Sequence, residues 1–288
     1  MRIAFFGDVH GCVLHALGAA VLLAARRGVR PDALVQVGDL GAFPTPERMD
    51  ESSRRFLAGH PAQGDFFRLL DPPPRVADGV RSALERVPPF LFVAGNHEDH
   101  DWLDSLHRED GRGPVAAVDP FGAYRHVACG NVVDVAGQRM AFLGRVEHPG
   151  TMDVDPAAYA RLMEAEPGSV NILVTHDGPY GMAEYRGQVQ GSPKVAALIE
   201  HLRPSLHVGG HYHHENGPRR YGPTVSYALS QLVGPKTDRD GSPVNPRQQV
   251  DPGSIGLFDT ETGAFEYVHD EWLAEVHGDD LDLAALVR

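Results

Sequence analysis

The chain has 288 residues, of which 42% are hydrophobic and 23% charged, and its formal net charge is −13 at pH 7. A chain of this length can bury a large core, and no stretch reaches the ~18 continuous apolar residues of a membrane span, so no membrane partner is expected. The negative charge disfavours extended duplex nucleic acid as a partner, because neutralised phosphates supply most of that affinity.

The N-terminus and the cysteines indicate a cytoplasmic protein. Met1 and Arg2 lead directly into an apolar run, without the apolar segment and small-residue cleavage site of a signal peptide. Cys12 and Cys129 are too few for a disulfide framework. No pattern in the sequence indicates an oligomeric state.

The first forty residues predict a strand, a helix and a second strand. Residues 3–6 form a short apolar run, and apolar positions recur at helical spacing over residues 13–25, with Gly28 as a stop signal. Residues 33–37 form the next apolar run. This order predicts two neighbouring parallel strands joined by a right-handed crossover.

Polar residues follow both of these strands. Asp8 and His10 come after the first strand, and Asp39 comes after the second. We expect all three at the carboxyl edge of the sheet, where ligands bind in open α/β folds. Asp8 and His10 lie two residues apart, so on an extended backbone their side chains would share one direction.

Residues 42–79 are less regular and rich in proline. Their apolar residues could form one or two short helices. A long insertion after a site loop is often a lid or a substrate-recognition element, and a surface excursion packed on the body fits the pattern equally well. A helix over residues 80–87 is predicted to lead into the next strand.

The apolar run of residues 89–94 ends in Gly95-Asn96-His97-Glu98. A buried strand with polar residues at its carboxyl end is predicted here. The Asn96 carbonyl is a hard oxygen donor for a metal, and His97 can move a proton near neutral pH. On its own the motif is also an ordinary turn.

The rest of the chain continues to alternate between helices and strands. Helices are predicted at 99–106, 155–165 and 192–202, a hairpin at 132–135 and 140–143, and further strands at 171–175, 206–208, 224–229, 255–259 and 265–268. The stretch 234–253 is predicted to be a loop. We expect an α/β fold of two packed mixed sheets flanked by helices, in a single domain over residues 1–288 with the insertion at 42–79.

Five metal-capable clusters each follow an apolar run. They are Gly7-Asp8-Val9-His10-Gly11, Gly38-Asp39-Leu40-Gly41, Gly95-Asn96-His97-Glu98, Thr175-His176-Asp177-Gly178-Pro179 and Gly209-Gly210-His211-Tyr212-His213. Any single Asp or His of this kind is more often a cap or a turn residue than a ligand. The joint set offers carboxylate, imidazole and amide donors without thiolate, which suits manganese, iron, zinc or nickel better than calcium or magnesium.

Five clusters in this order resemble the calcineurin-like metallophosphoesterase superfamily, and the match runs from Asp8 to His213. The resemblance implies an αββα sandwich that holds two divalent or trivalent metal ions, with manganese favoured over iron, zinc and nickel. It implies that one metal takes Asp8, His10, Asp39 and His213. It also implies that the other takes Asp39, Asn96, His176 and His211.

The resemblance also implies a mechanism. A hydroxide that bridges the metals attacks phosphorus, and His97 contacts the phosphate or protonates the leaving oxygen. Glu98 and Asp177 directly follow a predicted site histidine, so they are candidates for carboxylates that orient imidazoles. Arg145 and His148 are weaker candidates for phosphate binding, since an arginine can grip phosphate in a bidentate fork.

Three functions fit the residues. The favoured one is a phosphodiesterase acting on a small nucleotide-like diester or a short nucleic-acid end. Gly210-His211-Tyr212-His213 resembles an ending frequent in diesterase branches, and several motifs resemble the lariat debranching branch, which carries Cys where this chain has Asp8. The alternatives are a small-molecule phosphomonoesterase and a non-catalytic scaffold. A protein phosphatase is disfavoured because Gly38-Asp39-Leu40-Gly41-Ala42-Phe43 lacks the arginine of that branch.

Overall fold

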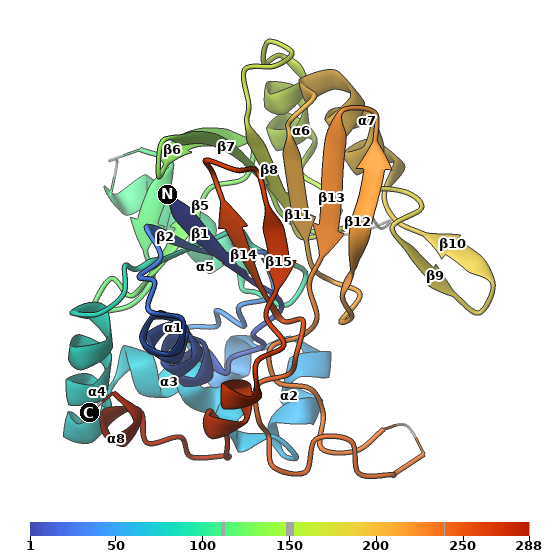
Figure 1. Cartoon of the computed structure of the whole chain (residues 1–288). Helices are drawn as coiled ribbons and strands as arrows, with labels where there is room; N and C mark the ends of the chain where they lie inside the picture. Colours follow the sequence, from blue (N-terminus) through green and yellow to red (C-terminus); the bar gives the residue numbers. More distant parts are fainter. Residues whose placement is uncertain (111–112, 148–152, 239, 288) are drawn as a thin grey trace.

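The computed structural model describes residues 1–110, 113–147, 153–238 and 240–287. Within these ranges, two large mixed sheets pack face to face (Figure 1). The first has the order β15-β14-β1-β2-β3-β5-β4 and the second the order β12-β13-β11-β8-β7-β6. The first sheet comprises β1 Arg2–Phe6, β2 Ala33–Gln36, β3 Phe90–Phe92, β4 Val115–Ala117, β5 Tyr124–Val127, β14 Ile255–Asp259 and β15 Phe265–Tyr267. The second comprises β6 Asn131–Val135, β7 Gln138–Leu143, β8 Ile172–Thr175, β11 Leu206–Gly209, β12 Asn216–Tyr221 and β13 Thr224–Ala228.

The centre of the first sheet is the predicted strand–helix–strand unit. β1 pairs in parallel with β2, with Ile3 opposite Ala33. The connecting helix α1 (Val13–Arg27) ends at Gly28, whose φ of 62° is the left-handed conformation that glycine tolerates. β2 in turn pairs in parallel with β3, so the carboxyl ends of all three strands lie at one edge.

The alternation of side chains along each strand builds the layers. In β1, Phe5 packs between the two sheets with Phe142 and Val174, whereas Phe6 points to the helices on the outer face. All of these side chains are buried, and full burial of an aromatic or aliphatic side chain stabilises the fold by roughly 1.5–3 kcal/mol.

Helices cover both outer faces of the sandwich (Figure 1). The outer face of the first sheet is covered by α1, α3 (Asp65–Leu70), α4 (Pro74–Leu84) and α8 (Leu283–Leu286). The second sheet packs against α6 (Pro156–Met163) and α7 (Pro193–Leu202). The predicted fold class, two packed mixed sheets flanked by helices, is confirmed.

The insertion at 42–79 is more helical than the sequence suggested. It contains the 3-10 helices η1 (Pro46–Arg48) and η2 (Pro61–Gly64), the helices α2 (Glu51–Leu57) and α3, and the start of α4. Pro46, Pro61 and Pro74 stand at the first positions of these helices. An N–H group at such a position has no partner within the helix, so its absence in proline costs no hydrogen bond. Prolines that suggested irregular chain therefore begin helices.

Five strands were not predicted, namely β4, β5, β9 (Ala183–Tyr185), β10 (Gln188–Gln190) and β12. Most of β12 is exposed or half-buried, so it lacks the apolar alternation that indicates a strand. Helix α5 (His100–Asp110) is also longer than the predicted 99–106. In the ranges that the structure describes, no helix has the length and apolar character needed to cross a membrane.

Candidate metal centre

Loops at the carboxyl ends of β1, β2, β3, β8 and β11 meet at one edge of the sandwich. The amides of Val9 and His10 donate to the Asp39 carbonyl at 2.9 and 2.8 Å. The amide of His97 donates to the Asp39 carboxylate at 2.7 Å. The amide of His211 donates to both oxygens of Asp8 at 3.1 Å. The Asp39 carbonyl therefore fixes the loop of His10, and the Asp39 and Asp8 carboxylates fix the loops of His97 and His211.

Glycines allow this close approach. A Cβ atom added to Gly95 would lie 2.2 Å from Asp39 Oδ1, and one added to Gly210 would lie 2.2 Å from Asp8 Oδ1. Any side chain at either position would displace a carboxylate. Gly95 and Gly210 are thus steric requirements of the site.

Four of the seven predicted ligands form a tight cluster: Asp8, His10, Asp39 and His213. One ligand atom from each lies within 4.8 Å of all the others. The Nε2 atom of His213 is 3.1 Å from Asp8 Oδ2 and 3.1 Å from His10 Nε2. Ligands that surround one ion at bond lengths of about 2.0–2.2 Å stand roughly 3–4 Å apart, so this donor set fits a transition-metal ion.

The other predicted ligands gather around His176, which also faces Asp39. His176 Nε2 lies 3.3 Å from Asp39 Oδ2 and 3.1 Å from Asn96 Oδ1. The ring of His211 stacks edge-on against that of His176, with centroids 5.2 Å apart. His176 Nδ1 faces the Val37 carbonyl at 3.2 Å, which orients the ring so that Nε2 points into the site.

Asp39 is the residue common to both donor groups. Its Oδ2 atom lies 3.9 Å from His10 Nε2 and 3.3 Å from His176 Nε2. Burial raises the pKa of the Asp39 carboxyl, but the neighbouring His176 and His10 outweigh burial and hold that pKa well below its usual range. The carboxylate is therefore in the deprotonated form that binds metals.

The backbone conformation differs from the predicted one. His10, His211 and His213 have φ angles of 46°, 70° and 58°, in the left-handed region rather than the extended one. The expectation that an extended backbone aligns Asp8 with His10, and His211 with His213, is wrong. Tight left-handed turns bring these side chains together instead. Such conformations are unfavourable for most residues, and they persist where the surrounding structure enforces them, often at functional sites.

His97 stands at the edge of the cluster, and its ring centroid is 5.5 Å from that of His10. Its Nδ1 atom lies 3.0 Å from Asp50 Oδ2. Burial lowers the pKa of His97, but the hydrogen bond to Asp50 and the charge of Asp39 outweigh burial and raise it to about 9. The imidazole is thus protonated at neutral pH and can give up a proton.

Asp50 was not predicted as a site residue. It caps helix α2 of the insertion, where its carboxylate accepts from the Ser53 amide at 2.9 Å and the Ser53 hydroxyl at 2.6 Å. An Asp before a short helix is a capping signal that the sequence does carry. Its pairing with His97 is a long-range contact, which no local pattern indicates.

Glu98 and Asp177 do not orient imidazoles as expected. The Glu98 carboxyl accepts from the amides of Gly95 at 2.7 Å and Gly41 at 3.3 Å. Asp177 accepts from the Tyr212 hydroxyl at 2.7 Å and the Glu147 amide at 3.0 Å. Both carboxyl groups fasten site loops to one another.

Of the two predicted phosphate-binding residues, the structure describes Arg145 but not His148. Arg145 follows β7, and its amide donates to the Ala94 carbonyl at 2.8 Å, beside the loop that carries Asn96 and His97. His148 lies outside the described residues.

Comparisons with curated proteins give several relatives. The chain is 29% identical over 149 residues to the UPF0046 protein K07C11.7 of Caenorhabditis elegans, covering 49% of this chain and 51% of that protein. It is 25% identical over 243 residues to the lariat debranching enzyme of Homo sapiens, covering 74% of this chain and 42% of the enzyme. The chain thus spans about half, or less, of the length of these relatives.

A solved structure and a family profile agree with the geometry. The crystal structure of TT1561 of Thermus thermophilus superposes with a TM-score of 0.51 at 17% identity, covering 93% of this chain and 97% of that one, which shows a shared fold. The profile of the calcineurin-like phosphoesterase family matches residues 1–215, a stretch that contains all seven candidate ligands and His97. This chain belongs to the calcineurin-like phosphoesterase family.

Proposed function

We propose that the protein is a metal-dependent phosphoesterase that hydrolyses phosphodiesters. The observation that carries this proposal is the position of Asp39 between two donor groups, with the cationic His97 beside them. Asp8, His10, Asp39 and His213 would hold one ion, and Asp39, Asn96, His176 and His211 the other. Two bound ions would act as Lewis acids and would lower the pKa of a bound water. Manganese suits this mixture of oxygen and nitrogen donors.

The chain's own residues would bind and orient the phosphate and deliver a proton. The Asp50 carboxylate holds His97 through Nδ1, which leaves Nε2 as the atom that can face a substrate. A protonated imidazole there donates to the oxygen of the leaving group as the bond to phosphorus breaks. This donation matters most for a poor leaving group such as the alkoxide of a natural diester.

The substrate class follows from charge and from the relatives. The net charge of −13 disfavours a long nucleic acid, whose binding depends on many cationic contacts. Similarity to lariat debranching enzymes over 74% of the chain supports a substrate related to nucleic acids. We therefore propose a small nucleotide-like diester or a short nucleic-acid end.

The experiment that tests this proposal compares two chromogenic esters. Manganese-loaded protein should hydrolyse bis-p-nitrophenyl phosphate with a higher kcat/KM than p-nitrophenyl phosphate. Repeating both assays with nickel, iron, zinc and magnesium identifies the metals that support the reaction. A tenfold or greater preference for the monoester would identify a phosphomonoesterase instead, and no hydrolysis of either ester with any metal would identify a scaffold.

A further inference from the structure

The insertion carries a short helix that begins beside the candidate metal centre. Its N-cap residue Asp50 lies 3.0 Å from His97 Nδ1, and Ser53 Oγ lies 3.4 Å from the same atom. Asp50 and Ser53 are three positions apart, so they share one side of α2. The next residue in this series, and the neighbour of Ser53 on the helix surface, is Phe56.

The Phe56 side chain is unusually open to solvent for an aromatic residue. Among the described residues, the aromatic side chains with about half of their surface exposed are Phe56 and Tyr180, at 49% and 53%. Tyr180 lines a separate groove with Pro193 and Ala196 of α7. Phe56 instead stands one helical turn beyond Ser53, about 4.5 Å farther along α2. An exposed aromatic ring therefore lies at the rim of the candidate centre.

His60 gives this ring a fixed neighbour. The ring centroids of Phe56 and His60 are 6.4 Å apart. His60 is buried, and its Nδ1 atom lies 2.7 Å from Gln248 Oε1 in the loop before β14. The Phe56 ring thus packs beside a residue that is tied to the body of the protein, which limits the positions that the ring can take.

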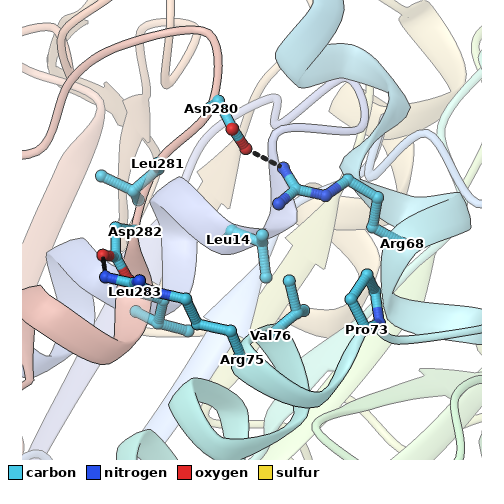
Figure 2. Close-up of a pocket in the computed structure, with 9 residues that line it drawn as sticks. All are labelled: Leu14, Arg68, Pro73, Arg75, Val76, Asp280, Leu281, Asp282 and Leu283. Atoms are coloured by element: carbon cyan, nitrogen blue, oxygen red, sulfur yellow. Dashed lines mark hydrogen bonds and ion pairs between the residues drawn. The ribbon is translucent and has the colours of Figure 1, made fainter.

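The two halves of the insertion are held differently. Figure 2 shows the pocket where the later half meets α1 and the C-terminal segment; there Arg68 of α3 pairs with Asp280, and Arg75 of α4 pairs with Asp282. In the earlier half, neither η1 nor α2 has a buried side chain. Helix α2 can therefore adjust to a ligand while α3 and α4 stay in place.

We propose that Phe56 is a specificity-determining residue that stacks on the base of a nucleotide substrate. This inference rests on the proposed function, since it names the part of a nucleotide-like diester that the chain recognises. A phosphate in contact with His97 would leave its nucleoside extending past Ser53 towards Phe56. Stacking uses the face of a ring and needs no cationic side chain, so it suits a chain with a net charge of −13.

The chemistry of stacking also limits what Phe56 can select. Every base presents a flat aromatic face, so an aromatic side chain accepts all of them. An alkyl ester presents no such face. Phe56 should therefore favour nucleotides over simple alkyl phosphoesters without selecting one base strongly.

Binding of two uncleavable phosphonates to manganese-loaded, full-length protein tests the proposal. One is an adenosine phosphonate in which a methylene group replaces the ester oxygen. The other is ethylphosphonate, which has the same charged group without a base. Wild-type protein should bind the adenosine compound at least tenfold more tightly than ethylphosphonate. Phe56→Ala should lose about tenfold in affinity for the adenosine compound and nothing for ethylphosphonate.

Two further variants separate stacking from a general effect on α2. Phe56→Trp keeps an aromatic face and should retain the affinity for the adenosine compound. Arg55→Ala is the matched control on the same helix, because Arg55 is exposed and pairs with Glu51 on the side of α2 away from Asp50 and Ser53. This control should bind both phosphonates as the wild type does.

Equal affinity of the wild type for the two phosphonates, or of the wild type and Phe56→Ala for the adenosine compound, would overturn the proposal. Hydrolysis of bis-p-nitrophenyl phosphate by the same wild-type protein would then show that the phosphoesterase function stands without it. Conversely, a preference for the adenosine compound that depends on Phe56, in a protein without hydrolysis, would support the base contact and contradict the proposed activity.

Discussion

The Asp50 carboxylate lies 3.0 Å from the Nδ1 atom of His97, and the two residues are 47 positions apart in the chain. Asp50 belongs to the insertion and caps its helix α2, whereas His97 follows the central strand β3. The insertion therefore supplies the carboxylate that holds the proposed general acid and raises its pKa. Through this contact, the 42–79 segment contributes a side chain to the candidate site.

Replacing Asp50 should change the pH dependence of hydrolysis. His97 acts in its protonated form, so activity is retained below its raised pKa of about 9 and lost as the pH rises through that value. Asp50→Asn removes the charge that raises this pKa. The pH at which activity is lost on the alkaline side of the pH–rate profile (the alkaline limb) should therefore move down towards the ordinary histidine pKa of about 6.5. At pH 8 we expect a loss of about tenfold in kcat, measured with a dialkyl or nucleotide diester.

Ser53→Ala provides the control for Asp50→Asn. It removes a hydroxyl that donates to Asp50 at 2.6 Å and lies 3.4 Å from His97 Nδ1, but it leaves the carboxylate beside His97. The alkaline limb of this variant should stay near that of the wild type. An unchanged limb in Asp50→Asn would show that the carboxylate does not set the protonation of His97.

His97→Ala should discriminate between leaving groups. The loss should reach about 10²–10⁴-fold for a diester with an alkoxide leaving group, because that oxygen needs a proton. With p-nitrophenolate as the leaving group the loss should be much smaller. Metal content should not change, since His97 is outside the donor set. Equal losses with both substrates would assign His97 to phosphate binding rather than proton donation.

Asp39→Asn should reduce metal occupancy as well as rate. The neutral amide cannot replace the charge of a carboxylate that lies between His10 and His176. We expect at least one manganese ion per chain to be lost after dialysis, together with most of the hydrolysis. Asp177→Asn is a suitable comparison, because Asp177 binds Tyr212 and the Glu147 amide rather than the donor groups. Full manganese retention in Asp39→Asn would contradict the shared-ligand arrangement.

Glu98→Ala should lower stability. Its buried carboxyl accepts from two backbone amides, and removal leaves both N–H groups without their partner. The expected cost is about 2–4 kcal/mol, seen as a lower Tm or a lower denaturant midpoint. Glu85→Ala, at the exposed end of α4, should change stability by less than about 0.5 kcal/mol. A Glu98→Ala protein as stable as this control would show that the two amide contacts contribute little.

Asp65 should make the protein less stable as the pH rises. Burial raises its pKa from 3.8 to about 7, so the folded state holds this proton where the unfolded state has lost it. Stability therefore falls between about pH 4 and 7 and levels off above that range. The Tm of Asp65→Asn relative to wild type should rise over this interval. A constant Tm difference across the interval would contradict the shifted pKa.

The sequence predicts the central architecture well because its signals are local. Apolar runs buried on both faces form β1, β2 and β3, and each ends at a glycine followed by polar residues. Exposed β12 carries no such signal, since its pairing with β13 is decided by the neighbouring strand. The insertion contains more helix than the one or two short helices predicted, because proline serves both to interrupt and to begin helices.

Convergence of the candidate ligands is predictable from their places at strand ends, but the local geometry is not. The left-handed backbone at His10 and His213 cannot be located from the sequence, because histidine adopts this conformation more often than most residues but still only in a minority of cases. The Asp50–His97 contact likewise depends on how the insertion packs. Residue identity indicates which groups take part, and tertiary packing determines how they are oriented.

Anomalous diffraction from manganese-soaked crystals is the most direct test of the central claim. Two peaks should appear about 3.5–4 Å apart, one on each side of the Asp39 carboxylate. Asp8, His10 and His213 should ligate one peak, and Asn96, His176 and His211 the other. A single peak, or none near Asp39 in well-ordered, manganese-saturated crystals, would contradict the dinuclear account.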